Sequence, residues 1–423
     1  MTGMTTGGSA DERFGALCAA VDPVARRFTA DGQRLYLVGG VVRDVLLDRS
    51  GDHPDIDLTT DAPPDRIRSL LEGVVDAVWL QGEKFGTIGA RRGDLTLEIT
   101  THRAEAYLSE SRKPVVSFST RLEDDLLRRD FTVNAMAVDV VDRSLHDPLG
   151  GQADLDARLL RTPLAPEESF SDDPLRMLRA ARFLAGFGLV PATGLAEAAR
   201  TVAERLRIVS AERIRDELWR LLALADPTVG LDFLDETRQL PLFLPEVSER
   251  PAPERAEVLR RTAAADPVPE VRLAALLLDL SAPVLEERLR ALRLSGGQRA
   301  TVLGLTAAVG RIRASADDAW SDEAVRRLAA SAGDHLTEAV ALAATAGVAT
   351  GVLAERLSGL RAEGELDDLG SALGGAAVIE LLGLEPGPDV GAAVAWLADL
   401  RLREGRLGAD EEGRRLVEWW ERR

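Results

Sequence analysis

The chain has 423 residues, of which 45% are hydrophobic and 29% charged, a composition typical of a soluble globular protein with about two to four domains. No apolar run is long enough to span a membrane, and the N-terminal residues lack the basic and then apolar plan of a signal peptide. The only cysteine, Cys18, excludes internal disulfides and thiolate metal clusters and predicts a cytoplasmic location. The net charge of −18 argues against indiscriminate nucleic-acid binding, so RNA would have to bind one local face; we expect no membrane and no DNA partner.

The first part of the chain, to about residue 160, predicts an α+β segment. Helices are predicted at residues 11–29, 41–47 and 64–71, and strands at residues 35–38, 56–60, 76–81, 87–91 and 95–101. Apolar and polar residues alternate through the last of these strands, which is the pattern of a half-buried strand. A polar loop is predicted at residues 104–121.

Strand signals vanish beyond about residue 160, where Ala, Leu, Arg and Glu recur at helical spacing. Gly and Pro break this pattern at residues 188–194, 226–229, 264–269 and 384–389. The sequence therefore predicts an α+β head followed by a long all-helical remainder.

Two short motifs in the head predict a metal-dependent nucleotide site. Asp55 and Asp57 are two residues apart on a predicted strand, so both carboxylates project from one face, close enough to share divalent metals. Gly39 and Gly40 open a predicted helix, where backbone N–H groups can approach phosphate oxygens. Together they describe a site for a nucleoside triphosphate and its cations.

Three further segments carry charged residues in regular patterns. The run from Arg128 to Ala135 places two arginines, Asp130 and Asn134 in one turn region, suited to triphosphate oxygens and a ribose hydroxyl. Asp173, Arg176, Arg179 and Arg182 recur every three residues on a helix that begins near Pro174; the alternative is a solvated charged face. Ser210 is a plausible N-cap for the helix that contains residues 212–218.

At these residues the chain resembles the class II tRNA nucleotidyltransferase and bacterial poly(A) polymerase family. The matching segments are LVGGVVRDVLL (37–47), DIDLTT (55–60), RRDFTVNAMA (128–137), DDPLRMLRAARF (172–183) and ERIRDEL (212–218), in the order and at spacings comparable to those of the family. The resemblance implies a polymerase-β-like nucleotidyltransferase head with a mixed sheet, then a helical neck, body and tail. It divides the chain into residues 1–160 (catalytic head), 161–225 (neck, binding the nucleotide base and RNA) and 226–423 (body and tail, binding tRNA).

The resemblance also assigns roles by position. Asp55 and Asp57 would hold Mg²⁺, and the nucleotide-binding residues would be Gly39, Gly40, Arg43, Arg129, Asp130, Asn134, Asp173, Arg176, Arg179 and Arg182. Asp173 and Arg176 would read base edges in place of a template, an acceptor and a donor suited to cytosine and adenine. Glu98 is the candidate for a third catalytic carboxylate; a structural glutamate packed against Arg103 or Arg129 is an equal alternative.

Two regions bear on which family member this chain resembles. Residues 110–121 resemble the flexible loop needed to switch from C to A addition, and Arg112 and Lys113 are candidate substrate contacts. Many relatives carry a phosphohydrolase motif that reads roughly LLHDxGK, whereas here Leu278 replaces its histidine and only Asp279 persists. The HD-like region near residues 271–300 is therefore expected to be degenerate, and we expect no phosphohydrolase activity.

The function implied is template-independent addition of CCA to tRNA 3′ ends from CTP and ATP. The motifs do not separate this from a poly(A) polymerase or an A-adding tRNA nucleotidyltransferase. A non-catalytic RNA-binding paralogue and a small-molecule nucleotidyltransferase are alternatives from other classes; the intact carboxylates disfavour the first and the long helical remainder disfavours the second.

Overall fold

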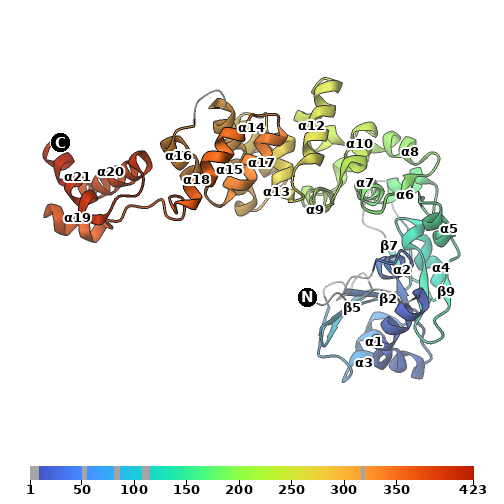
Figure 1. Ribbon diagram of the computed structural model, residues 1–423. Helices are drawn as coiled ribbons and strands as arrows, with labels where there is room; N and C mark the ends of the chain where they lie inside the picture. The colour runs from blue at the N-terminus through green and yellow to red at the C-terminus, as the bar shows by residue number, and fades with distance from the viewer. Residues whose placement is uncertain (1–8, 50–54, 81–85, 107–114, 316–319) are drawn as a thin grey trace. The chain divides into compact units, whose positions relative to one another are not determined.

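The computed structural model describes residues 9–49, 55–80, 86–106, 115–315 and 320–423 (Figure 1). They form two compact units, Met1–Pro245 and Glu246–Arg423. The first unit contains every strand found among the described residues, and the described part of the second is helical.

The first unit is built on a mixed seven-stranded sheet. Its strands, in spatial order, are β3 (Ala77–Trp79), β4 (Thr87–Arg92), β5 (Leu95–Thr101), β2 (Asp55–Thr60), β1 (Leu35–Val38), β8 (Ala137–Asp139) and β9 (Leu145–His146). β2 and β5 run parallel to each other, and all other neighbours in this sheet are antiparallel. The predicted α+β head is confirmed.

The two faces of this sheet differ in polarity. Ile56 and Leu58 of β2 and Ile88 of β4 are at most 1% exposed, because helices α1 (Ala10–Ala30) and α3 (Pro64–Leu71) pack on their side (Figure 1). At the alternate positions Asp55, Asp57 and Glu98 are exposed, whereas Thr96 and Thr100 are half-buried and Thr59 is buried. One face of the sheet is thus the core of the head, and the other is open where these three carboxylates lie.

Two small strand pairs depart from the sequence-based predictions. Strands β6 (Arg103–Ala106) and β7 (Val115–Phe118) pair antiparallel inside the segment predicted as a polar loop, so that prediction is wrong for these residues. The adjacent β-branched residues Val115 and Val116 favour a strand. β10 (Leu159–Leu160) and β11 (Val190–Pro191) pair in parallel, and two-residue strands are too short to show a period.

Among its described residues, the first unit contains eight further helices besides α1 and α3. They are α2 (Gly40–Leu46), α4 (Leu122–Leu127), α5 (Gly151–Asp156), α6 (Pro166–Asp172), α7 (Leu175–Phe187), α8 (Leu195–Thr201), α9 (Ala211–Leu222) and α10 (Thr228–Glu236), with short 3₁₀ turns at Thr132–Asn134, Ala203–Ile208 and Leu240–Leu242. α7 packs against both α9 and α10. Gly230 of α10 permits this, because a Cβ there would lie 2.6 Å from the carbonyl oxygen of Ala181.

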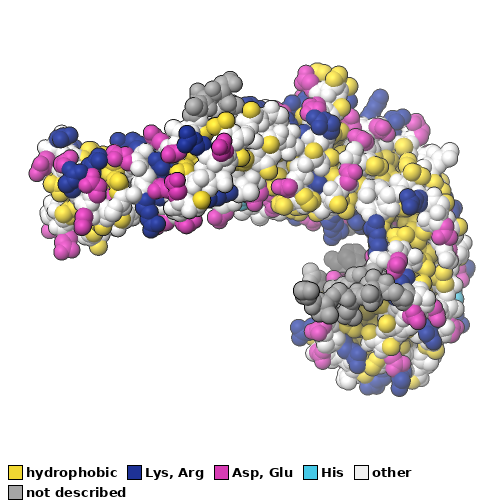
Figure 2. Space-filling view, in the orientation of Figure 1, with side chains coloured by type: hydrophobic (Ala, Val, Ile, Leu, Met, Phe, Trp, Pro, Cys, Tyr) yellow, Lys and Arg dark blue, Asp and Glu magenta, His cyan; other side chains and the backbone are white. Residues whose placement is uncertain are grey.

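The second unit begins within the short helix α11 (Pro245–Ser248). Its helices are α12 (Ala252–Ala264), α13 (Pro269–Leu277), α14 (Ala282–Ala291), α15 (Gly296–Ala314), α16 (Asp322–Ala332), α17 (Leu336–Thr345), α18 (Gly351–Ala362), α19 (Gly375–Leu382), α20 (Pro388–Glu404) and α21 (Ala409–Glu421). On the face shown in Figure 2, basic and acidic side chains are interspersed over these helices. The predicted helical remainder is confirmed, and no helix in the described ranges is long and apolar enough to cross a membrane.

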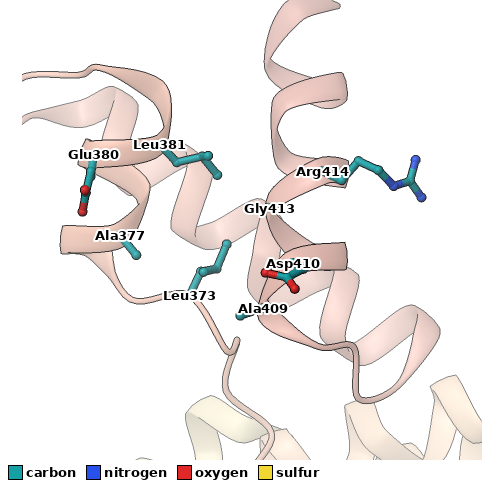
Figure 3. Close-up of a pocket in the computed structure, with 8 residues that line it drawn as sticks. All are labelled: Leu373, Ala377, Glu380, Leu381, Ala409, Asp410, Gly413 and Arg414. Carbon is teal, nitrogen blue, oxygen red and sulfur yellow. The ribbon is translucent and has the colours of Figure 1, made fainter.

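A pocket of about 570 Å³ lies between α19 and α21 (Figure 3). Leu373, Ala377 and Leu381 form its apolar wall, whereas Arg414 points away from it and pairs with Glu411 and Glu418 on its own helix. The carboxylates of Glu380 and Asp410 complete its lining.

Candidate active site

The two aspartates of the DxD motif lie on the open face of the sheet. Asp55 and Asp57 are exposed, and Ile56 and Leu58, which alternate with them on β2, are 1% exposed. In the parallel register of β2 and β5, Asp57 lies opposite Glu98, which is also exposed. The structure therefore brings the three predicted carboxylates to one face.

The electrostatics show that these carboxylates influence one another. Partial burial raises the pKa of Glu98, and the charges of Asp57 and then Asp55 raise it further. The pKa of Asp57 is also raised, by limited hydration and by Asp55, while Arg129 opposes the shift. A cation between Asp55 and Asp57 would remove this repulsion.

The donor set fits a divalent cation of the Mg²⁺ type, which commonly binds one or two protein carboxylates and completes its shell with water and substrate phosphates. No group of three or more metal-ligating side chains converges on one point within the described part of the chain. Among the described residues, Asp55 and Asp57 are thus the pair that could hold such an ion, and Glu98 lies opposite Asp57 on the neighbouring strand. The charges that shift the pKa of Glu98 are those of Asp57 and Asp55, and Arg129 forms its ion pair with Asp125.

The Gly-Gly turn lies directly beside the carboxylates. Gly39 precedes α2 with φ of 80°, a conformation that other residues rarely adopt. A Cβ on Gly39 would lie 3.0 Å from Nη1 of Arg129 and 3.7 Å from Oδ2 of Asp57. The glycine thus lets the start of α2, Arg129 and Asp57 approach one another.

Arg129 is held at this junction by a buried carboxylate that the sequence analysis did not identify. Its Nη2 donates to Oδ2 of Asp125 at 3.1 Å, and Arg128 donates to Oδ1 of the same side chain at 2.6 Å. Burial alone would raise the pKa of Asp125, but Arg129 and Arg128 outweigh it and lower the pKa to about 2. The spacing of three and four residues from Asp125 to the arginine pair on a helical turn is the signal that could have revealed it.

One donor of Arg129 has no acceptor. Its Nε is buried and has no hydrogen-bond partner among the described residues. A buried donor without an acceptor costs about 1–3 kcal/mol, and functional sites commonly carry such groups. The atom of Arg129 that lies beside the glycine turn is Nη1, 3.0 Å from where a Cβ on Gly39 would lie.

Arg43 is fixed behind the Gly-Gly turn. Its Nη1 donates to Oδ1 of Asn134 at 2.6 Å and its Nε to Oδ1 of Asp44 at 2.9 Å. Its guanidinium lies 4.1 Å from the ring centroid of Phe187, a cation–π contact. Asn134 in turn donates to Oδ1 of Asp130 at 2.9 Å, so these three predicted residues form one chain of hydrogen bonds.

The same chain continues into helices α7 and α9. Arg179 donates from Nε to Oδ2 of Asp130 at 2.8 Å and from Nη1 to Oε1 of Glu217 at 3.3 Å. Arg182 donates to Oε2 of Glu217 at 2.7 Å. Burial would raise the pKa of Asp130, but Arg179 and Asn134 outweigh it and hold that pKa well below its usual range. Glu217 was not assigned a role from sequence, although it lies inside the last matching motif.

Asp173 and Arg176 occupy the start of α7. Arg176 is 6% exposed and donates to the Ser169 hydroxyl at 2.8 Å and to the carbonyl of Arg128 at 2.6 Å. Asp173 accepts from Nη2 of Arg213 at 3.0 Å and keeps part of its side chain exposed. Arg176, Arg179 and Arg182 are therefore not part of a solvated charged face, because each is buried or half-buried and donates to a specific partner.

The remaining residues singled out from the sequence lie at the N-cap of α9, in the segment before β7 and after α13. Ser210 occupies the N-cap of α9, as predicted, although its side chain makes no capping hydrogen bond. Arg112 and Lys113 lie outside the described residues. Asp279, the remnant of the phosphohydrolase motif, forms ion pairs with Arg250, Arg261 and Arg313.

Comparison with protein families shows what two segments of the chain are similar to. Residues 35–161 match the family described as the poly A polymerase head domain, and residues 188–250 match the probable RNA- and SrmB-binding site of polymerase A. The family resemblance predicted from the five motifs is confirmed.

Curated relatives extend the similarity. The chain is 40% identical over 201 residues to the CCA-adding enzyme of Bacillus pumilus (strain SAFR-032), covering 47% of this chain and 48% of the relative. It is 39% identical over 225 residues to the CCA-adding enzyme of Bacillus subtilis (strain 168), covering 52% and 55%. The matched region thus spans about half the length of these relatives.

Solved structures share the fold over nearly the whole chain. The Bacillus stearothermophilus CCA-adding enzyme in complex with CTP has a TM-score of 0.75 and 28% identity, covering 97% of this chain and 98% of that one. The Thermotoga maritima CCA-adding enzyme complexed with tRNA has a TM-score of 0.70 at 17% identity, covering 98% and 99%. At that lower identity the likeness concerns the fold alone.

Proposed function

We propose that this protein is a nucleotidyltransferase that adds CCA to tRNA 3′ ends without a nucleic-acid template, using CTP and ATP. The observation that carries the proposal is the junction of Asp57, Gly39 and Arg129, which places a carboxylate pair beside a tight glycine turn and a guanidinium. The similarity to CCA-adding enzymes, one of them solved with CTP at 28% identity, supports this substrate class.

In the proposed reaction the tRNA 3′-hydroxyl oxygen forms a bond to the α-phosphorus, the bond to the β-phosphate oxygen breaks, and pyrophosphate and the hydroxyl proton leave. Gly39 and Gly40 allow close approach of the triphosphate, and the guanidinium of Arg129, whose Nη1 lies beside the Gly39 turn, donates to one of its oxygens. Arg43, held by Asn134 and Asp44, adds fixed positive charge behind the turn. These groups are preorganised, so little reorganisation is needed as charge develops.

Proteins with this head generally use divalent metal ions, and we propose Mg²⁺, held by Asp55 and Asp57 with Glu98 as a neighbouring carboxylate. When bound, the ion supplies positive charge that stabilises the attacking and leaving oxygens. The protein's part is to keep the two carboxylates on one strand, where they alternate with buried Ile56 and Leu58.

We propose that Asp173 and Arg176 select the base. Arg176 is fixed by Ser169 and the Arg128 carbonyl, and Asp173 by Arg213, so an acceptor and a donor are presented from one helix end. In cytosine and adenine an exocyclic amine donates beside a ring nitrogen that accepts, which complements this pair. Arg179 and Arg182, fixed by Asp130 and Glu217, complete the nucleotide side of the site.

The proposal extends to the rest of the chain. Residues 1–160 would form the catalytic head. Residues 161–225 would form the neck. Residues 226–423 would form the body and tail, which bind tRNA by shape and phosphate contacts. The degenerate HD-like region near residues 271–300 would have no hydrolytic role, and the single cysteine supports a cytoplasmic location.

The test is to incubate the protein and Mg²⁺ with tRNA that lacks its CCA end, supplying CTP and ATP separately and together, and to sequence the product ends. Addition of CC from CTP alone and of CCA from both nucleotides is the expected result. The match to a poly A polymerase head makes poly(A) synthesis the second candidate. Long A tails, or one A added only to ends that already carry CC, would replace CCA addition by poly(A) polymerase or A-adding activity.

A further inference from the structure

A tryptophan lies in line with the carboxylates across four strands of the sheet. Trp79 of β3 pairs with Gly89 of β4, Gly89 with Glu98 of β5, and Glu98 with Asp57 of β2. Side chains that are direct cross-strand partners project from the same face. Trp79 therefore lies on the open face that carries Asp57, at the β3 edge of the sheet.

The indole extends over Gly89 toward the carboxylates. A Cβ on Gly89 would lie only 2.0 Å from Nε1 of Trp79, and Gly89 is buried although Trp79 is 37% exposed. Neighbouring strands are about 4.8 Å apart, so Gly89 is about 10 Å from the line of Asp57. The structure thus offers an exposed aromatic surface about two strand spacings from the carboxylates, on the same face of the sheet.

A basic side chain accompanies the tryptophan. Arg91 lies two residues beyond Gly89 on β4, hence on the same face, in the cross-strand row of Thr96 and Asp55. It is exposed, and its side chain forms no hydrogen bond or ion pair with any described residue. Arg92, on the opposite face, instead donates to the carbonyl of Ala20. An unpaired guanidinium next to an exposed indole is the combination that binds unpaired nucleotides.

The two sides of Asp57 differ in what they present. The Gly39 turn follows β1, on one side of β2, and it approaches Arg129 and the proposed triphosphate site. Trp79 and Arg91 lie on the other side, beyond β5. A nucleotidyl transfer has two substrates that meet at the reacting phosphorus, so the second side is the place for the RNA acceptor.

We propose that Trp79 and Arg91 bind the unpaired 3′-terminal nucleotide of the RNA acceptor, with its base stacked on the indole and its phosphate on the guanidinium. The proposal rests on the proposed function and adds to it the acceptor subsite, which is distinct from the incoming-nucleotide site. Stacking is tolerant of sequence because every base has a π face. This suits an acceptor whose terminal base changes at each addition.

The first test measures binding alone, by fluorescence anisotropy of labelled RNA hairpins that differ only in having a blunt end or unpaired 3′ nucleotides. The wild-type protein should prefer the unpaired end, and Trp79→Ala should lose about tenfold in affinity for it and little for the blunt hairpin. Trp79→Phe should retain most of the preference, because a phenyl ring still stacks. Val78→Ala is the matched control, since Val78 is 38% exposed on the same strand but points to the other face.

Arg91→Ala should weaken binding of the unpaired end and lower the slope of log affinity against log salt by about 1, the signature of one lost phosphate contact. A wild-type protein without preference for the unpaired end, or equal losses in Trp79→Ala and Val78→Ala, would overturn the proposal. Because these measurements need no turnover, they remain informative even if CCA addition is not the activity.

The second test separates acceptor from nucleotide. In steady-state assays, Trp79→Ala and Arg91→Ala should raise KM for the RNA acceptor about tenfold while KM for CTP stays within about twofold of wild type. A selective rise in KM for CTP would place the incoming nucleotide on Trp79 instead and overturn the acceptor assignment. Absence of turnover in the wild-type protein would contradict the proposed function, without touching the binding result.

Discussion

Arg213 of α9 donates from Nη2 to Oδ2 of Asp173 at 3.0 Å, and the backbone N–H of Leu175 donates to Oδ1 of the same carboxylate at 3.2 Å. Both oxygens of Asp173 are thereby oriented before any nucleotide binds. A carboxylate has about four acceptor positions, so it can still accept from an exocyclic amine. A side chain fixed in this way suits recognition of one hydrogen-bonding edge.

We expect Asp173→Ala to lower kcat/KM for CTP and ATP and to narrow their advantage over UTP and GTP. When uracil or guanine is bound, a donor or acceptor is left unpaired, which costs about 1–3 kcal/mol. Removing the carboxylate of Asp173 removes this penalty, so discrimination against UTP and GTP should fall. Arg129→Ala is the comparison, because it should weaken all four nucleotides similarly. Steady-state kinetics with the four nucleotides decide the matter, and unchanged CTP:UTP discrimination in a folded Asp173→Ala protein would refute the role in base selection.

Asp55→Ala and Asp57→Ala should each reduce turnover at least about 100-fold, because losing a carboxylate at the metal site removes several kcal/mol of transition-state stabilisation. Both residues are exposed, so the thermal midpoint and tRNA affinity should change little. Asp65→Ala, which removes an exposed carboxylate of α3, is the control and should keep wild-type turnover. Turnover above a few per cent in both active-site variants would exclude the metal assignment.

Asp130→Ala should destabilise the first unit by about 3–5 kcal/mol, since it leaves Arg179 half-buried without its main partner and breaks the chain to Asn134 and Arg43. Denaturant unfolding followed by circular dichroism measures the change. Glu204→Ala, which breaks an exposed ion pair with Arg207, should cost less than about 1 kcal/mol. Equal costs for the two variants would show that the buried network does not stabilise the fold.

Acid should destabilise the head through Asp125. Its pKa is lowered from 3.8 to about 2 in the folded protein, so it stabilises the fold above the unfolded pKa and loses that effect as pH falls from about 4 to about 2. The contribution is about 2 kcal/mol by linkage. Asp125→Asn should therefore flatten the dependence of unfolding free energy on pH in this window, whereas Asp65→Asn should not. Identical slopes in all three proteins would contradict the role of the Arg128 and Arg129 pairs.

The purified protein should show no metal-dependent hydrolysis of 2′,3′-cyclic phosphates or phosphomonoesters. Leu278 stands where the related motif has histidine, and the carboxylate of Asp279 is engaged by Arg250, Arg261 and Arg313. The measurement is phosphate release with added divalent cations. Phosphate release that persists in the Asp55→Ala variant would demonstrate a separate hydrolytic site and contradict this prediction.

The sequence was most informative where a local pattern determines the structure. The alternation along β5 and the apolar residues of β2 and α3 gave those elements nearly to the residue, because one face of each is buried. The position of Asp55 and Asp57 on one face followed from the same alternation.

What the sequence did not reveal depends on contacts between distant segments. Glu217 lies 38 residues from Arg179, and Arg213 lies 40 residues from Asp173. A single sequence does not predict these two ion pairs, since they form only when α9 packs on α7. The alignment of Trp79 with Asp57 was invisible for the same reason, because it arises from the strand order of the sheet and not from chain order.

The chain of bonds from Arg43 through Asn134 and Asp130 to Arg179 has a mechanical consequence. It connects the glycine turn of the head to the helix that carries Asp173 and Arg176, and every link lies within one compact unit. In the proposed reaction, moving α7 away from the head to change the preferred base would break the ion pair between Arg179 and Asp130, at a cost of several kcal/mol. Any accommodation of a different base would have to arise from small rotations of side chains at the helix end, on a frame that stays stiff throughout the reaction cycle.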